Sequence, residues 1–294
     1  MITEIAPAPE RAASEPARPR KKRRAWDEVP RRHIYLPLSL YLLFTLIPFY
    51  WILLFALRPA GSTSLVPWPM TFDHFEKVWN ERAFGTYFHN SVLVGVATLV
   101  MTTVVALAGG YALARFDFRI KKAFMLALLC TQFVPGALLL VPLFEIFANL
   151  RMINSLASVV IAETVFQLPL SMILISGFIR NVPYSLEEAA WVDGCNRFTA
   201  FRIVVLPLLR PGLIAVGSFA FVHAWNHFLF ALMFLSDQSK QTIPVGLNTL
   251  MSADSVDLGA LAAGGIIAAV PVVIVFAFIQ KWLITGFSAG AVKG

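Results

Sequence analysis

The chain has 294 residues, of which 58% are hydrophobic and 14% are charged, and its mean hydropathy is +0.71. A soluble domain of this length cannot bury so much apolar side chain, so the composition predicts an all-α integral membrane protein. The net charge of +7 would suggest nucleic-acid binding in a soluble protein. Because the basic residues flank apolar runs, where they act as topology signals, we expect no nucleic-acid partner.

The chain begins with a polar segment that is followed by six apolar runs. Residues 1–33 are rich in Ala, Pro, Glu and Arg and contain clustered bases, which predicts a disordered basic tail that is retained rather than cleaved as a signal. Each apolar run is long enough to cross a hydrocarbon core of roughly 30 Å, and none alternates with the period of a membrane strand. We therefore expect six transmembrane helices, near 34–57, 90–114, 123–144, 156–179, 211–235 and 258–280.

Basic residues are distributed unequally between the two sides that six spans define. Of the 24 Lys and Arg residues, nineteen fall in the N-terminal tail, the loops after the second and fourth spans, and the C-terminal end. The other five fall in the loops after the first, third and fifth spans. The positive-inside rule thus predicts that both termini are cytoplasmic, and an even number of spans requires the same result.

The loop at 184–211, YSLEEAAWVDGCNRFTAFRIVVLPLLRP, is a polar stretch between the fourth and fifth of these spans and has the clearest signals of local structure. Ser185 and Glu188 have the spacing of a capping box, which predicts a short helix that starts near Leu186. Gly194 is expected to end this helix, because glycine accepts the left-handed conformation common at helix C-termini. Phe198, Phe201 and Val205 then predict one face of a second short helix. Such a pair of helices could dock a partner or lie on the lipid headgroups.

The same loop resembles the EAA loop of ABC-importer permeases, whose usual form is EAA-x3-G-x9-I-x-L-P. Glu188-Ala189-Ala190 is followed after three residues by Gly194, and after nine more by VVLP, with Val204 in place of the usual Ile. Asp193 before the glycine is also typical of this loop. The resemblance extends over about 86–294 and is closest to the carbohydrate branch, of the maltose type, in FVHAWNHFLFALMFL and ITGFSAGAVKG.

The resemblance implies a fold, an activity and a set of partners. It implies the type I ABC importer permease fold, with a first helix at 34–57, a permease core of five transmembrane helices at 86–284 that includes the loop at 184–211, and a cytoplasmic tail at 285–294. The chain would carry a sugar or oligosaccharide across a bacterial inner membrane together with a second homologous permease, a cytoplasmic ABC ATPase dimer and an extracytoplasmic sugar-binding protein. The residues implied at the ATPase interface are Glu188, Ala189, Ala190, Asp193, Gly194, Leu206 and Pro207.

Polar residues inside the predicted spans are candidates for the translocation path. Glu163 is the only carboxylate well inside a span, where an acid either serves function or pairs structurally with a neighbour. The segment HAWNH resembles the A-W-N-E-F motif of sugar permeases, with His227 where an acid is common. Inter-helix hydrogen bonding is an equal alternative for this segment. The candidate path residues are Gln132, Glu163, Gln167, Trp225, Asn226 and His227.

The chain does not show the motifs of an enzyme. No lysine follows a glycine, so a P-loop is absent, and no catalytic triad can be assembled. His223 and His227 stand four residues apart, but they lack a third metal ligand nearby, and two cysteines make no zinc pattern, so we expect neither a metal nor another cofactor. Two alternatives to a sugar importer remain: an ABC permease for a non-sugar solute, and a secondary transporter that couples protons through Glu163 and the histidines.

Overall fold

The computed structural model describes the backbone of residues 31–251 and 256–291, and the side chains of residues 35–251 and 256–280. The described residues form helices and loops and contain no strand, so the predicted all-α class is confirmed. Residues 1–30 of the predicted N-terminal tail lie outside the described part. The chain divides into two units, Met1–Phe49 and Tyr50–Gly294.

The first unit contributes most of helix α1, Arg31–Leu57, which contains Pro37 and Pro48. The predicted first span at 34–57 is therefore a single helix with a slightly earlier start. Its apolar side chains are exposed along most of its length; Phe44, for example, is 75% exposed. A helix that is apolar all round and exposed in the isolated chain is expected where the surroundings are hydrocarbon.

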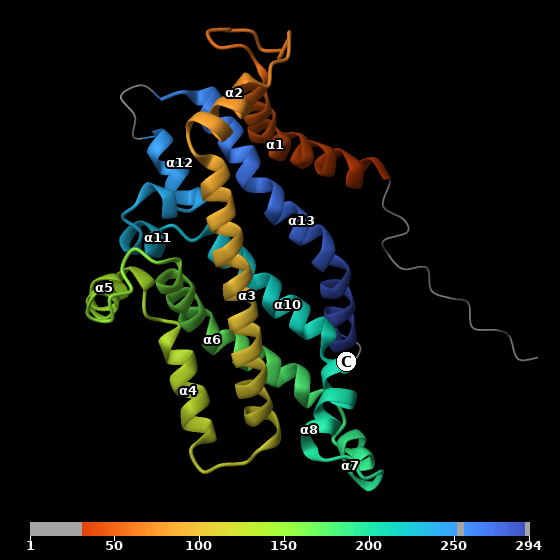
Figure 1. Cartoon of the computed structure of the whole chain (residues 1–294). Helices are drawn as coiled ribbons and strands as arrows, with labels where there is room; N and C mark the ends of the chain where they lie inside the picture. The colour runs from red at the N-terminus through yellow and green to blue at the C-terminus, as the bar shows by residue number, and fades with distance from the viewer. Residues whose placement is uncertain (1–30, 252–255, 292–294) are drawn as a thin grey trace, which may run out of the picture. The chain divides into compact units, whose positions relative to one another are not determined.

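The second unit contains the other helices, which Figure 1 labels in chain order. Their bounds are α2 Asp73–Glu76, η2 Lys77–Glu81, α3 Phe84–Arg115, α4 Lys121–Thr131, η3 Gly136–Leu139, α5 Leu140–Asn149, α6 Leu156–Arg180, α7 Ser185–Val192, α8 Arg197–Ala200, η4 Phe201–Val205, α9 Leu206–Leu208, α10 Arg210–Asn226, α11 Leu229–Phe234, η5 Gln238–Lys240, α12 Ile243–Met251 and α13 Leu258–Ala291.

Four of the described helices, α1, α3, α6 and α13, are long and apolar enough to cross a membrane, and two bent pairs raise the number to six. The predicted third span is the pair α4 and η3–α5, which bends by 94° where Pro135 adopts an extended conformation. The predicted fifth span at 211–235 is shorter than expected, because α10 ends at Asn226 and His227 is extended. The backbone of α13 continues to Ala291, past the predicted sixth span.

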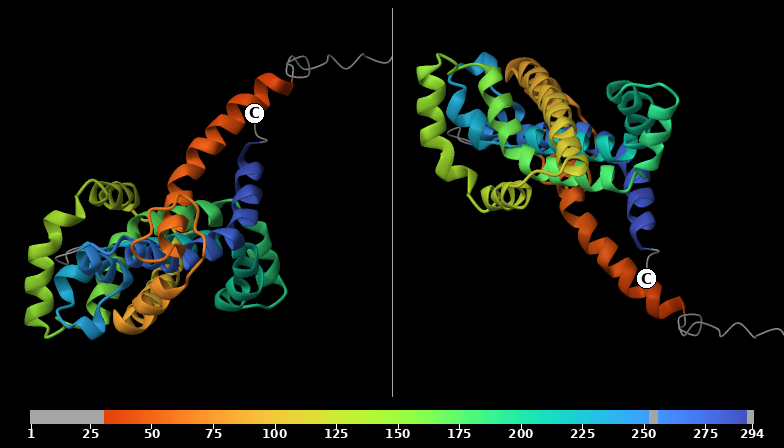
Figure 2. Two further views of the ribbon diagram at one scale, coloured as in Figure 1. Left: turned by 90° about the horizontal axis from the view of Figure 1, so that it is seen from above. Right: turned by 90° about the horizontal axis from the view of Figure 1, so that it is seen from below.

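Helices α3, α6, α10 and α13 form the centre of the second unit, and α4 and α5 lie at its margin in both views of Figure 2. The most extensive contact between described helices is that of α3 with α6, where glycines on α3 let the two backbones approach. A Cβ atom added to Gly110 would lie 2.8 Å from a methyl carbon of Ile175 and 3.1 Å from the backbone oxygen of Met172. The α3–α6 contact therefore depends on small residues.

We expect Gly110→Ala to lower the melting temperature of the purified protein, because the new methyl group meets a backbone oxygen that cannot move independently. Overpacking of this kind costs about 1–3 kcal/mol. The matched control is Gly177→Ala on α6, where an added Cβ meets nothing within 4 Å and alanine favours the helix. Equal melting temperatures for the two variants, measured by intrinsic fluorescence in detergent, would contradict this view of the α3–α6 contact.

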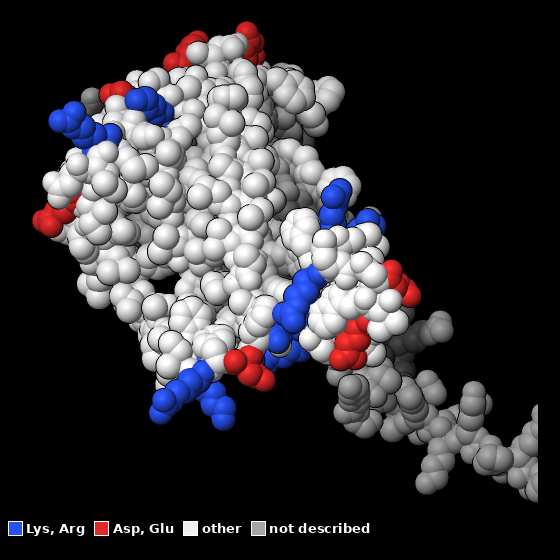
Figure 3. All heavy atoms as spheres, turned by 60° about the horizontal axis from the view of Figure 1, so that its bottom comes forward, with Lys and Arg blue, Asp and Glu red and all other residues white. Residues whose placement is uncertain are grey.

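Charged side chains gather toward the ends of the second unit, and the middle of the face in Figure 3 has none. At one end, Asn90 donates hydrogen bonds of 2.9 Å to the backbone oxygens of Ser239 and Gln241. Lys77 contacts Asp257 there at 2.9 Å. Burial raises the pKa of Asp257, but the Ala260 amide and the Lys77 ammonium together lower it by more than burial raises it. The pKa of Asp257 therefore lies below its ordinary value, and the group is a carboxylate. The loop 116–120 and helices α7 and α8 lie at the other end (Figure 1).

Candidate functional site

The loop at 184–211 folds as the predicted pair of short helices, but it begins differently from the prediction. Helix α7 starts at Ser185, and the residue before it, Tyr184, already has helical backbone angles of φ −64° and ψ −30°. Ser185 is therefore inside the helix, where its hydroxyl cannot cap the first turn, and no side-chain cap bond forms. The predicted capping box of Ser185 and Glu188 is wrong.

Gly194 ends α7 in a left-handed conformation, with φ +89°, as predicted. Its amide donates to the oxygen of Trp191 at 3.0 Å, and the amide of Cys195 donates to the oxygen of Ala190 at 2.9 Å. These two bonds form a Schellman motif, which satisfies carbonyls that the helix leaves free. Asn196 then caps α8, since its side-chain oxygen accepts from the amide of Thr199 at 2.8 Å. The turn between the two helices is thus fixed on both sides.

The second helix departs from the predicted face. Val205 is fully buried, but Phe198 is 73% exposed. Residues Phe201–Val205 form a π-helical turn, which adds a residue to the turn and moves the apolar face out of the expected register. Phe198 consequently points away from the core that holds Val205.

A buried ion pair fixes α7 to the end of α3. The side chain of Glu187 is fully buried, and its Oε1 accepts from the Arg115 Nε at 2.6 Å. Its Oε2 accepts from the Tyr111 hydroxyl at 2.7 Å. Arg115 also donates to the backbone oxygen of Val182 at 2.9 Å, and its guanidinium lies over the ring of Tyr184. The carboxylate and the guanidinium thus satisfy each other, as buried charges must.

The residues predicted at the ATPase interface lie on the outer surface of this loop, with three exceptions. Glu188, Ala189, Asp193 and Gly194 are exposed, Leu206 and Pro207 are partly buried, and Ala190 is buried. The prediction missed Glu187, Arg115 and Tyr111, which hold the loop in place. Exposed apolar side chains accompany the exposed polar ones: Leu186, Val192, Phe198 and Ile203.

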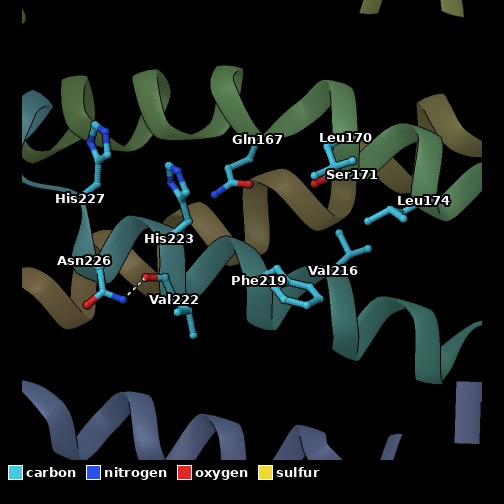
Figure 4. Close-up of a pocket in the computed structure, with 10 residues that line it drawn as sticks. All are labelled: Gln167, Leu170, Ser171, Leu174, Val216, Phe219, Val222, His223, Asn226 and His227. Atoms are coloured by element: carbon cyan, nitrogen blue, oxygen red, sulfur yellow. Dashed lines mark hydrogen bonds between the residues drawn. The ribbon is translucent and has the colours of Figure 1, made fainter. Parts of the chain in front are cut away.

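A second feature is a cavity of about 670 Å³ between α6 and α10. Figure 4 shows polar side chains at one end of it and apolar side chains at the other. Gln167, His223, Asn226 and His227 lie at the polar end, together with Val222. Leu170, Leu174, Val216 and Phe219 lie at the apolar end, where Ser171 is beside Leu170.

The two histidines project from the C-terminal part of α10 toward α6 and converge on Glu163, whose side chain is fully buried. His223 Nδ1 lies 3.1 Å from Oε2 of Glu163 in hydrogen-bonding geometry. His227 Nδ1 lies 2.6 Å from Oε1, within ion-pair distance, although this contact is not aligned as a hydrogen bond. The imidazole rings stack with centroids 5.3 Å apart. The i, i+4 spacing therefore places both histidines in contact with one carboxylate.

Not all of the predicted path residues belong to this cavity. Gln167, Asn226 and His227 line it, and Glu163 lies behind the histidines. Trp225 is buried on the other side of α10, where its indole nitrogen donates to the backbone oxygen of Ala268 on α13 at 3.0 Å. Gln132 is exposed and donates to the oxygen of Phe166 at 3.4 Å. Trp225 and Gln132 thus connect helices and do not line this cavity. His223 does line the cavity, although it was not among the predicted path residues.

Comparison with known proteins gives a consistent result. Residues 104–288 match the family described as "Binding-protein-dependent transport system inner membrane component". The chain is 35% identical over 252 residues to the diacetylchitobiose uptake system permease protein DasC of Streptomyces coelicolor, covering 84% of this chain and 91% of the relative. It is 30% identical to the trehalose transport system permease protein SugB of Mycobacterium tuberculosis, covering 85% and 93% of the two chains.

The fold is also similar to that of a solved structure. A chain of a bacterial ABC transporter involved in the import of the acidic polysaccharide alginate aligns with a TM-score of 0.70 and 21% identity. The alignment covers 86% of this chain and 98% of the solved one. The helix arrangement is therefore that of the type I ABC importer permease fold, as predicted.

Proposed function

The chain belongs to the family of binding-protein-dependent transport system inner membrane components, and we propose that it is the permease of an ATP-driven importer for a sugar or oligosaccharide. Family membership makes it a multi-pass inner-membrane transport component. The relatives named above take up diacetylchitobiose and trehalose, which supports a carbohydrate cargo. The observation that carries the proposal is the rigid, exposed helix pair α7–α8, held to α3 by a buried ion pair.

In this proposal α7 and α8 dock on a cytoplasmic ABC ATPase. The exposed Leu186, Val192 and Phe198 offer apolar contact, and Glu188 and Asp193 offer charge beside it. Two short helices fixed by a Schellman motif and a side-chain cap present this surface without a further ordering cost. Because Glu187 connects α7 to α3, movement of the docked helix would be transmitted directly to a membrane-spanning helix.

The cavity between α6 and α10 is the proposed part of the translocation path in this chain. A second homologous permease would complete the path, and an extracytoplasmic binding protein would deliver the cargo. The loop 116–120 and helices α7 and α8 lie at one end of the second unit, which would be its cytoplasmic end. The distribution of basic residues along the sequence supports cytoplasmic termini as well.

The test is to co-express the chain with its candidate partner subunits and to ask whether an ATPase co-purifies. We expect proteoliposomes that contain the complex to take up a labelled sugar only when ATP is inside and the binding protein is outside. A protonophore should leave this uptake unchanged. Failure of any ATPase to co-purify, combined with uptake by this chain alone, would contradict the proposal.

The arrangement of Glu163, His223 and His227 favours a second candidate, a secondary transporter driven by protons. A buried carboxylate in contact with two histidines beside an open cavity is a constellation that can hold and release a proton. This candidate predicts uptake that a protonophore abolishes and that does not need ATP. It gives no role to the exposed helix pair, so the importer is the better-supported function.

A further inference from the structure

We propose that Glu163, His223 and His227 share a single proton and form a solute-binding site of zero net charge. Together with Gln167 and Asn226 this site would select an uncharged hydroxylated solute over an acidic one. The proposal rests on the proposed function in one respect, since the solute is taken to be the cargo of the importer. We call the three residues the Glu–His–His triad.

The first step is the isolation of the carboxylate. Glu163 lies in the membrane-spanning helix α6, and an uncompensated carboxylate at that depth is costly. The elements packed against α6 and α10 bring their other charged or titratable groups only near their ends, and α11, α12 and the described side chains of α13 bring none. Those groups are Tyr87, His89, Tyr111 and Arg115 on α3, Lys121, Lys122 and Cys130 on α4, Arg180 on α6, and Arg210 at the start of α10 itself. Compensation must therefore come from the two histidines.

The second step is the position of the proton. His227 Nδ1 and Oε1 of Glu163 lie 2.6 Å apart, within ion-pair distance, so we assign the charged imidazole to this contact. The 3.1 Å contact of His223 is aligned and has the length of a bond from a neutral N–H donor. These geometries place an imidazolium at His227 and a neutral imidazole at His223. The charges of His227 and Glu163 then cancel.

The third step is the number of protons. The stacked rings of His223 and His227 have centroids 5.3 Å apart, so two imidazolium ions would repel each other. A second proton would also give the triad a net positive charge within the span. One shared proton satisfies the carboxylate and avoids both penalties.

The fourth step is what the cavity offers to a solute. His223 donates its Nδ1 proton to Glu163, so its Nε2 is an acceptor, and its side chain is 47% exposed. The amide nitrogen of Gln167 is buried without a hydrogen-bond partner, and Gln167 lines the cavity beside His223 (Figure 4). Asn226 donates to the oxygen of Val222 and keeps its own oxygen free to accept. Such a mixture of donors and acceptors matches hydroxyl groups, which both donate and accept.

The apolar end of the cavity completes the match. Phe219 is 53% exposed there, beside Leu170, Leu174 and Val216. A sugar ring has hydroxyl groups at its edge and a carbon–hydrogen face that packs on apolar side chains. An acidic solute would enter a site without net charge and would lose hydration without gaining a compensating positive charge. The site therefore fits an uncharged hydroxylated solute.

The first test uses dicyclohexylcarbodiimide, which labels protonated carboxyl groups in membranes, with the label located by mass spectrometry in the membrane-embedded full chain. At about pH 7.5, within the physiological range, we expect no label on Glu163 of the wild type. The double variant His223→Gln with His227→Gln should gain the label, because Glu163 then has to be protonated. Each single variant keeps one histidine and should remain unlabelled. A labelled wild type or an unlabelled double variant would overturn the proposal.

The second test needs no substitution and stands even if the double variant does not fold. Diethyl pyrocarbonate modifies neutral imidazole, so the wild type should react at His223 and be protected at His227. Trehalose at a concentration near its Kd should slow the reaction at His223 about twofold, because half of the sites are occupied, and glucuronate should not. Equal reaction at both histidines, or protection by glucuronate in place of trehalose, would overturn the proposal. Neither assay needs an ATPase, so these results separate failure of the triad from failure of the importer function.

Discussion

Glu187→Ala is expected to cause the largest loss of any single substitution in the loop between α6 and α10. The substitution leaves the Arg115 guanidinium, whose side chain is only 9% exposed, without its carboxylate. Breaking a buried pair by removing one partner costs about 3–5 kcal/mol. We expect a much lower melting temperature and, in the assembled importer, loss of ATP-driven uptake, measured by intrinsic fluorescence in detergent and by sugar uptake into proteoliposomes.

Two further variants separate the ion pair from the surface of the loop. Glu188→Ala removes the neighbouring carboxylate, which is exposed, and should leave the melting temperature nearly unchanged. The double variant Glu187→Leu with Arg115→Met replaces both charges by apolar side chains, and such replacements are often neutral in stability. We expect it to restore the melting temperature. A Glu187→Ala protein as stable as Glu188→Ala would show that the pair does not hold α7.

The role of Glu187 depends on a contact that the local sequence does not indicate. The sequence predicted the short helix and its glycine end because both depend on neighbouring residues, such as the two backbone bonds around Gly194. The partner of Glu187 is 72 residues away on α3, and the spacing of residues along the loop contains no trace of that contact. The two adjacent glutamates look alike in sequence, yet one is fully buried and the other exposed.

In the cavity too, the sequence indicates the candidate residues, but the contacts between them depend on helix packing. An acid inside an apolar run is visible in any sequence, so Glu163 could be predicted as a candidate. The i, i+4 spacing of His223 and His227 was equally visible, but it did not identify what the two rings contact. Only the packing of α6 against α10 brings the carboxylate to both rings. Trp225, in the same five-residue segment, faces α13 because α10 is surrounded by helices, and its direction does not follow from its polarity.

Gly194→Val is expected to abolish co-purification of the ATPase and to reduce ATP-driven uptake by a factor of about ten or more. Gly194 has φ +89°, in the region that residues with a Cβ rarely adopt, and an added Cβ would meet nothing within 4 Å. The cost is therefore one of backbone conformation, about 1–2 kcal/mol for an ordinary residue, and 1.4 kcal/mol corresponds to a tenfold change in an equilibrium. A β-branched side chain is especially unsuited to this conformation.

The matched variant Gly194→Asn decides whether conformation or volume matters. Asparagine is larger than glycine but tolerates the left-handed region, so it should keep much of the ATPase binding and the uptake. The bonds from Gly194 to Trp191 and from Cys195 to Ala190 set the angle between α7 and α8. If this angle is what the ATPase recognises, valine disrupts docking and asparagine preserves it. Equal losses for both variants would instead show that the ATPase packs directly against the bare glycine, and retained binding in Gly194→Val would contradict docking through this turn.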